Sequence, residues 1–431
     1  MLEINLESEP LSETWRNDTV SVLYELARQF PGQPVTMIAG RERLLLLQDR
    51  GRIRHVLVSN ADKYLKNFGG FEMLFGRSRF TTDGDLWRQL QAISQPYITG
   101  ARPAEVVTAS VTAFERAADR LLAAGPGPVA IDPILNRATG DVIADVTFGD
   151  HGLDIENTVE DLRNVLRFGS QLSWNIGSLS TPDDENERRI ADASRARLAQ
   201  SITAALERSG AMVGASGLLK SIFEMEIEGS DPVAEVAALL FAGLDTSAAA
   251  MVWGLFLLAN SPDLQKHLRQ QVRGVLGNAP PSLEMLQQIP DLAAFRDEVM
   301  RIFPPVPMLG RISVAADTVD GVEIEPGQRL MLSIVGLHHD PQTFPRPGQV
   351  QLSRYKSGRL DGAAAQSHMP FGGGKRICAG VRIGNVELLT AFAVLLNRVE
   401  VKLADLSPLK FEWTASLRRR GGQRLMIAAA R

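Results

Sequence analysis

The sequence predicts a mainly α-helical fold with a small β portion, which is the α+β class. Three observations predict it: apolar residues recur at helical spacing over long segments, strand-like segments are few and short, and alternating βαβ units are missing. The third observation argues against a Rossmann-type dehydrogenase. The chain of 431 residues, 45% of them hydrophobic, can bury an interior deep enough for a sizeable cofactor. We predict that residues 1–431 form one domain.

The predicted β portion consists of two hairpins and one further strand. Segments 35–39 and 43–47 lie on either side of Gly40 and are predicted to pair as a short hairpin. The segment 319–324 turns at Gly321, and a strand over 329–333 follows it. These short segments leave most of the chain for helices.

Eight segments carry apolar residues at helical spacing and are therefore predicted helices. They are 85–98, 103–124, 132–148, 184–208, 234–259, 261–274, 291–302 and 380–397. Segments 171–183 and 341–370 are rich in Pro, Gly and Ser, so we expect loops there. The most apolar stretch, 248–259, is about half as long as a membrane span requires, so we expect no membrane anchor.

Composition and charge argue against several classes of protein. A formal net charge of -4 and a pI near 6.0 argue against a general nucleic-acid binder. One cysteine excludes an intrachain disulfide and fits a reducing compartment. The acidic N-terminus lacks the basic and apolar regions of a signal peptide. We therefore expect a cytoplasmic protein with neither a nucleic acid nor a membrane as its partner.

The most informative segment is PFGGGKRICAG, residues 370–380, which contains the only cysteine, Cys378. Three successive glycines allow a tight turn with uncovered amides, and this turn enters a predicted helix at Cys378. Amides and a helix N-terminus favour the thiolate, which is the metal-ligating form. A phosphate loop or dinucleotide fingerprint would need other residues at Met369, Arg376 and Ile377, and a zinc site would need a second cysteine. A buried structural cysteine is the remaining alternative.

A second polar group interrupts the most apolar predicted helix at Asp245 and Thr246. A buried carboxylate is costly without a role or partners. Gly243 lacks a side chain, and the Thr246 hydroxyl can bond a carbonyl one turn earlier, so the helix can open a groove here. We interpret Asp245 and Thr246 as groups that deliver protons into a dry cavity. A polar kink with satisfied hydrogen bonds is the alternative.

The pattern Phe371-x-x-Gly374-x-Arg376-x-Cys378-x-Gly380 resembles in full the haem-binding signature of the cytochrome P450 family. Three further motifs of this family occur in the right order, so the resemblance covers nearly the whole chain. It implies the family's fold, with haem b buried between the long oxygen-binding helix and the cysteine loop, and Cys378 as the axial thiolate ligand of the iron. It also implies a monooxygenase that uses O2 to oxidise an apolar small molecule, such as a terpenoid, steroid-like or fatty substrate.

The resemblance further assigns roles to individual residues. Asp245 and Thr246 match the family's acid–alcohol pair, which helps to protonate iron-bound dioxygen. Glu298 and Arg301 match its buried Glu-x-x-Arg network, with Arg354 as a looser third member; taken alone, this pair would be a solvated surface pair. The implied cofactor-binding residues are Trp87, Gln91, Ala242, Gly243, Arg311, His368, Phe371, Gly372, Arg376 and Gly380. Gln91 departs from the family's frequent Arg or Lys, and an amide gives a weaker propionate bond.

Substrate and electron donor are also implied by the resemblance. The implied substrate pocket is apolar and consists of Phe68, Phe71, Leu74, Phe75, Phe241, Val306, Met308 and Trp413. Because no fused reductase fits in the chain, the donor is expected to be a separate ferredoxin or flavodoxin with its reductase. Arg88, Lys375 and Arg382 predict a basic docking patch for it, or else a solvated charged face. A peroxygenase, a dehydratase, a C–C coupling enzyme and a haem sensor are alternative functions.

Overall fold

The computed structural model describes residues 2–8, 11–66, 71–72, 75–149, 152–173, 185–211, 217–277, 279–355, 359–413 and 415–430. The side chains of 11, 12, 16, 17 and 170–173 are not among the described groups. The α-helices of this part of the chain are α1 (Leu11–Gln29), α2 (Arg50–Arg54), α4 (Gly84–Gly100), α5 (Pro103–Ala123), α6 (Asp132–Phe148), α7 (Ile155–Ser173), α8 (Glu185–Ala211), α9 (Leu218–Phe223), α10 (Pro232–Asn260), α11 (Pro262–Leu276), α12 (Leu283–Leu286), α13 (Pro290–Ile302), α14 (Ile334–His338), α15 (Gly362–Ser367) and α16 (Val381–Arg398). Short turns of other helical types are η1 (His55–Ser59), η2 (Ala61–Lys63), η4 (Leu352–Arg354) and η5 (Gly374–Arg376).

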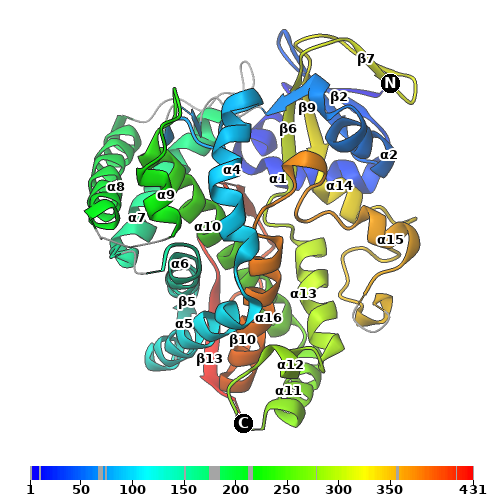
Figure 1. Ribbon diagram of the computed structural model, residues 1–431. Helices are drawn as coiled ribbons and strands as arrows, with labels where there is room; N and C mark the ends of the chain where they lie inside the picture. The colour runs from blue at the N-terminus through cyan, green and yellow to red at the C-terminus, as the bar shows by residue number, and fades with distance from the viewer. Residues whose placement is uncertain are drawn as a thin grey trace.

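The strands of the described residues form four sheets. The largest is a six-stranded mixed sheet in the order β1 (Leu2–Asn5), β2 (Val35–Ala39), β3 (Glu42–Leu47), β9 (Arg329–Ser333), β6 (Met308–Ser313), β4 (Tyr64–Lys66). A three-stranded sheet has the order β10 (Val399–Leu403), β13 (Arg424–Ala429), β5 (Pro128–Ala130). Two hairpins complete the β portion: β7 (Asp317–Val319) with β8 (Val322–Ile324), and β11 (Phe411–Trp413) with β12 (Leu417–Arg419). In Figure 1 strands β2, β6 and β9 of the six-stranded sheet lie near the top of the molecule, and β5, β10 and β13 lie among the helices in its lower part.

The α+β class and the long predicted helices are confirmed, and most helix ends lie within about three residues of the predicted ones. Two long helices were missed. Helix α1 is polar and contains a kink at Asp18, whose side chain accepts a hydrogen bond from the Ser21 amide and so starts a second helical run. Helix α7 extends to Ser173, so the loop predicted over 171–183 begins too early. Residues 174–183 of that predicted loop lie outside the described residues. The predicted loop at 341–370 also contains η4 and α15.

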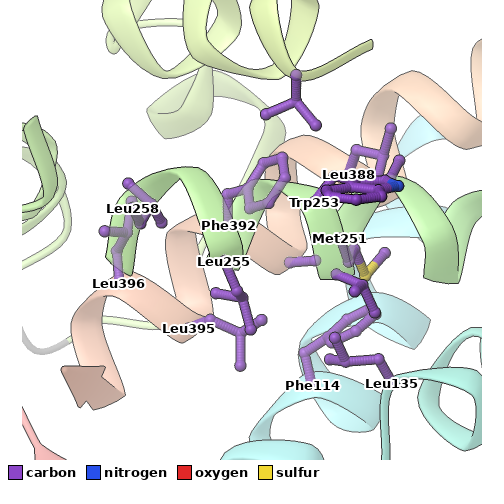
Figure 2. Close-up of a cluster of buried hydrophobic side chains, with 14 of the residues drawn as sticks. Phe114, Leu135, Met251, Trp253, Leu255, Leu258, Leu388, Phe392, Leu395 and Leu396 are labelled. Atoms are coloured by element: carbon purple, nitrogen blue, oxygen red, sulfur yellow. The ribbon is translucent and has the colours of Figure 1, made fainter. Parts of the chain in front are cut away.

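The main core lies where α10 and α16 pack together with α5, α6 and α13. Figure 2 shows α10 and α16 side by side, with Phe392 of α16 beside Leu255 and Leu258 of α10. Trp253 and Phe392 are fully buried. A smaller core holds α1 against the six-stranded sheet. These contacts fix the two central helices, and the candidate site lies between them.

Helix α10 is the only described helix that is long and apolar enough to cross a membrane by length and composition. The predicted apolar stretch of 248–259 is therefore too short, because small and branched apolar residues extend it toward Pro232. However, 78% of its most apolar window is buried inside the protein. The burial identifies α10 as the central core helix of the described fold.

Candidate functional site

A cavity of about 350 Å³ lies between α10, strand β6 and the loop that leads into α16. Its size is typical of a small-molecule site. Nine of the ten predicted cofactor-binding residues border it, and so do Thr246 and Cys378. These nine are Trp87, Gln91, Ala242, Gly243, Arg311, Phe371, Gly372, Arg376 and Gly380. The sequence motifs therefore meet at one place, although they are separated by up to about 300 residues along the chain.

The loop before α16 has a fixed shape. The amide of Cys378 donates to the Phe371 carbonyl at 3.0 Å, and the amide of Ile377 donates to the Gly374 carbonyl at 3.1 Å. Gly374 has a φ of +69°, and a Cβ atom there would lie 1.9 Å from the carbonyl oxygen of Leu57. Only glycine fits both conditions. The glycine of the motif therefore serves close packing against η1.

The Cys378 sulfur faces the cavity, and protein surrounds it on its other sides. We expected several amides to converge on the sulfur, but the structure gives one such backbone contact, from Gly380. Burial raises the pKa of the Cys378 thiol, and the Gly380 amide and the Arg79 charge oppose this rise without cancelling it. The Gly380 amide thus acts in the predicted direction, toward the thiolate, but the effect of burial is larger. A bound metal cation deprotonates a coordinating thiol by its own charge.

Several cationic side chains border the cavity, among them Lys66, Arg311 and Arg376. Burial and the neighbouring Arg376 lower the pKa of Lys66 to about 7, and burial lowers the pKa values of Arg311 and Arg376 to about 10. The Arg376 guanidinium lies 3.5 Å from the centre of the Trp87 ring and pairs with Asp83. Clustered cations in a place of low polarity favour an anionic ligand. The two propionates of a haem have the charge that this cluster favours.

Sequence reasoning missed Lys66 and Arg79 at this edge. The Arg79 guanidinium donates to Ser94 Oγ and Gln95 Oε1, both at 2.8 Å, and its amide donates to Glu235 Oε2 at 2.7 Å. Arg79 thereby ties the segment before α4 to α4 and to the start of α10. Neither residue belongs to a recognised motif, so only the fold could reveal them.

His368 does not border the cavity, so its expected contact with a propionate is wrong in this structure. Its imidazole shares a hydrogen bond of 3.2 Å with the Asp297 carbonyl and stacks on His338 at 5.3 Å. Those contacts hold the His368 ring away from the residues that border the cavity. Arg88 does not border the cavity either, because it pairs with Asp85 on the surface.

The structure brings Glu298, Arg301 and Arg354 together. Arg301 Nε donates to Glu298 Oε1 at 2.6 Å, Nη2 donates to Oε2 at 2.9 Å, and both side chains are fully buried. Arg354 Nε lies 3.6 Å from Glu298 Oε2. Tyr355, which replaces the family's usual Phe, adds a hydrogen bond of 3.1 Å to Glu298 Oε1. A solvated surface pair is therefore excluded, and the network ties α13 to the segment before α15.

Asp245 does not border the cavity. Its Oδ1 accepts a hydrogen bond of 2.5 Å from Arg418 of β12, and Arg418 also pairs with Asp132 at 3.3 Å. Arg418 donates further to Asn136 Oδ1 at 3.0 Å. All four side chains are buried. Arg418 is therefore the centre of a buried ion-pair cluster behind α10, and Asp245, which we expected to deliver protons into the cavity, is not among the residues that border it.

Thr246 does face the cavity, and its hydroxyl donates to the Ala242 carbonyl at 2.8 Å, as expected. The role expected of Gly243 needs correction. A Cβ atom on Gly243 would lie 2.3 Å from Ile143 Cγ1, so the glycine allows α6 to approach α10 closely. Helix α10 continues without a break from Pro232 to Asn260. Close packing accounts for this glycine.

The remaining wall of the cavity is mainly apolar. Phe71, Phe241, Val306, Met308 and Trp413 border the cavity, as expected of a substrate pocket. The ring centres of Phe71 and Phe241 lie 6.4 Å apart, and Phe75 lies 6.0 Å from Phe241. The predicted pocket residues Phe68 and Leu74 lie outside the described residues.

The three cations of the predicted docking patch, Arg88, Lys375 and Arg382, all have partners within the protein. Arg88 pairs with Asp85, Lys375 pairs with Asp62, and Arg382 donates to the Thr99 carbonyl at 3.5 Å. Each of these cations therefore has an anionic or carbonyl partner.

Taken together, a thiol that faces a cavity, a cation cluster at its edge and an apolar wall define a haem-thiolate site. The family model for cytochrome P450 matches residues 11–423, and the chain belongs to this family. The cofactor of the family is haem b, and the residues described above fit it.

Curated relatives and solved structures agree with this family. Cytochrome P450 4A24 of Sus scrofa is 33% identical over 299 residues, which cover 64% of this chain and 58% of the relative. Taurochenodeoxycholic 6 alpha-hydroxylase of Sus scrofa is 36% identical over 176 residues, which cover 40% of this chain and 34% of the relative. The chain thus spans little more than half of the first relative. A mutant haem domain of cytochrome P450DA has a TM-score of 0.85 at 18% identity, covering 100% of this chain and 98% of that one. Retinoic acid bound cyanobacterial CYP120A1 has a TM-score of 0.77 at 19% identity, covering 94% and 93%.

Proposed function

We propose that this protein is a single-domain monooxygenase that uses O2 to oxidise an apolar small molecule. The observation that carries the proposal is the position of Cys378, which faces α10 across a cavity with apolar walls. A thiolate-bound haem favours cleavage of the O–O bond of dioxygen. The chain's own residues then have four tasks: to bind the haem, to position the substrate, to exclude water and to supply protons.

Cys378 would hold the haem through its sulfur, and the cation cluster would bind the propionates. Lys66, Arg311 and Arg376 supply positive charge at one edge. Trp87 holds the Arg376 guanidinium against its ring, which fixes the direction of that cation. The small residues Ala242 and Gly243 leave room on the α10 side.

Positioning of the substrate is assigned to the aromatic and aliphatic wall. Phe71, Phe241 and Trp413 offer rigid apolar surface, which binds a hydrophobic molecule and excludes water from the site. The relatives named for taurochenodeoxycholic hydroxylation and for bound retinoic acid support a molecule with a large apolar skeleton. We propose a terpenoid, steroid-like or fatty substrate.

We further propose that electrons come from a separate ferredoxin or flavodoxin with its reductase, and that the protein is cytoplasmic. The partner is expected to bind on the Cys378 side, near Lys375 and Arg382. Each of these two residues has a local partner, so docking would have to exchange those contacts for new ones.

The carbon monoxide complex of the reduced protein tests the haem ligand. The wild type should give the red-shifted Soret band typical of thiolate ligation, and Cys378→Ser should lose it. A Cys378→Ser variant with an unchanged spectrum and full activity would refute the proposal. A panel of apolar ligands, scored by the low-spin to high-spin shift and by oxidation with ferredoxin and reductase, then tests the substrate class.

A peroxygenase is the second candidate, because the Asp245 carboxylate binds Arg418 and leaves the cavity without the expected acid. Hydrogen peroxide would then support oxidation without any electron donor. Turnover that requires the donor proteins and O2 would exclude this candidate.

A further inference from the structure

The cysteine loop, residues 370–380, is held at its beginning by Met369. The amide of Met369 donates a hydrogen bond of 2.9 Å to His338 Nε2, and its carbonyl accepts one of 3.0 Å from the Gly372 amide. The Met369 side chain lies beside Gly373, because a Cβ atom on that glycine would lie 2.6 Å from Met369 Cε. Among these contacts, the bond to His338 is the one that ties the loop to α14.

His338 is the last residue of α14, and the buried ion pair of α13 fixes its backbone. The His338 carbonyl accepts a hydrogen bond of 3.2 Å from Arg301 Nη1, and Arg301 pairs with Glu298. The His338 side chain is fully buried, and its ring lies 5.3 Å from the ring of His368. A continuous set of contacts therefore leads from this ion pair through His338 to the start of the cysteine loop.

The hydrogen bond from Met369 requires a neutral His338 ring. Because Nε2 is the acceptor, the ring carries its proton on Nδ1, and a second proton on Nε2 would face the amide proton of Met369. Nδ1 is buried and has no hydrogen-bond partner among the described residues. Protonation of Nε2 would therefore remove the hydrogen bond that the ring makes with the loop segment, and the charged ring would be left in a dry place.

The groups nearest to His338 oppose a positive charge on its ring. Burial, followed by the His368 ring and the Arg301 guanidinium, lowers the pKa of the His338 imidazole well below its usual value. His339, the next residue along the chain, acts in the same direction, and the smaller effect of the Arg301 backbone opposes them. The ring is therefore neutral at pH 7, which is the state that the bond from Met369 requires.

Titratable groups on the other elements packed against α14 have partners elsewhere. These elements are α1, α13 and β6. The Tyr24 hydroxyl of α1 donates to the Ile302 carbonyl at 2.7 Å, and Arg311 of β6 borders the cavity. On α13, Glu298 is bound to Arg301. A charged His338 ring would thus lie near a guanidinium, and the nearest described carboxylate on α13 is already paired.

We infer that His338 is a positioning residue of the haem-binding site: its neutral ring holds Met369 and thereby the cysteine loop, and protonation of the ring releases the loop. The step takes up one proton from solvent at Nε2 and breaks the hydrogen bond from the Met369 amide. The inference concerns how the loop is held for haem binding. It does not depend on the proposed oxidation of a substrate, so failure to find a substrate would not affect it.

Hydrogen exchange of the haem-loaded protein at pH 7, measured on peptides that contain Met369, tests the bond directly. His338→Phe removes the acceptor and keeps an aromatic ring, and it should speed exchange of the Met369 amide by about tenfold, the factor expected for the loss of one hydrogen bond. His338→Gln keeps an acceptor oxygen and should retain slow exchange. His267→Gln, the same change at an exposed histidine of α11, should exchange like the wild type. Unchanged exchange in His338→Phe would overturn the inference.

An acid titration of the carbonmonoxy spectrum then tests the role of the proton. The wild type should lose the Soret band of thiolate ligation only well below pH 6.5, because His338 takes up a proton against the effect of burial. His338→Gln cannot take up this proton, so it should keep the band to a lower pH than the wild type, whereas His267→Gln should lose it together with the wild type. Protonation of other groups affects all three proteins alike. If His338→Phe does not fold, this comparison decides, and a His338→Gln variant that loses the band at the same pH as the wild type would overturn the inference.

Discussion

Removal of Arg418 should destabilise the fold more than removal of any exposed arginine. Arg418 lies between Asp132 and Asp245, at 3.3 and 2.5 Å, and also donates to Asn136. All of these side chains are buried, so Arg418→Met leaves two carboxylates without their cation. Breaking a buried pair in this way costs about 3–5 kcal/mol, and the presence of two anions places the expected loss toward the upper end.

The assay is urea-induced unfolding of the haem-loaded protein at pH 7, followed by circular dichroism and by haem absorption. Arg419 on the same strand is a matched control, because its partner Asp405 is half exposed. Arg419→Met should therefore cost much less. Adding Asp245→Asn to Arg418→Met removes one unpaired charge and should recover part of the loss. Because Arg418 and Arg419 are equally buried, equal losses for the two variants would refute the argument that burial of the partner carboxylates decides the cost.

Three further predictions concern the loop, the core and acid stability. Gly374→Ala should abolish haem binding, because its Cβ would clash with the Leu57 carbonyl; a normal carbonmonoxy spectrum would contradict this. Phe392→Ala should cost about 3–5 kcal/mol in urea unfolding, as for other fully buried aromatics, and a loss below about 1 kcal/mol would count against it. Burial lowers the pKa of His339 from 6.5 to about 4, so the folded state binds fewer protons and stability should fall from pH 6.5 to 4. His339→Gln should lessen this acid loss, and an unchanged pH profile would refute the assignment.

Sequence reasoning could locate the helices and the motifs because both depend on local pattern. The spacing of apolar residues placed α6 and β9 at their observed bounds. The thiolate motif likewise identified Cys378, since a long run of fixed residue types is specific without any structure. Local pattern fails where it is interrupted, as in α1, where Asp18 divides the helix into two short runs.

Side-chain direction was the part that the sequence could not supply. Asp245 and Thr246 are neighbours in a motif, but successive residues of a helix point about 100° apart, so the fold decides which of them reaches the cavity. Arg418 lies 173 residues from Asp245 and belongs to no motif, so nothing local indicates that it binds that carboxylate. The same holds for His368, whose ring is taken by Asp297 and His338.

The unexpected side-chain directions of Asp245 and His368 have one physical origin. In a dry interior each charged group needs a partner, and the strongest available partner determines where its side chain points. Arg418 binds Asp245 on the side away from the cavity, whereas Glu387 accepts a hydrogen bond from the Ser247 hydroxyl, and burial raises the pKa of Glu387 to about 8. The positions of the cations around the two helices therefore decide which of the two buried acids is held in an ion pair.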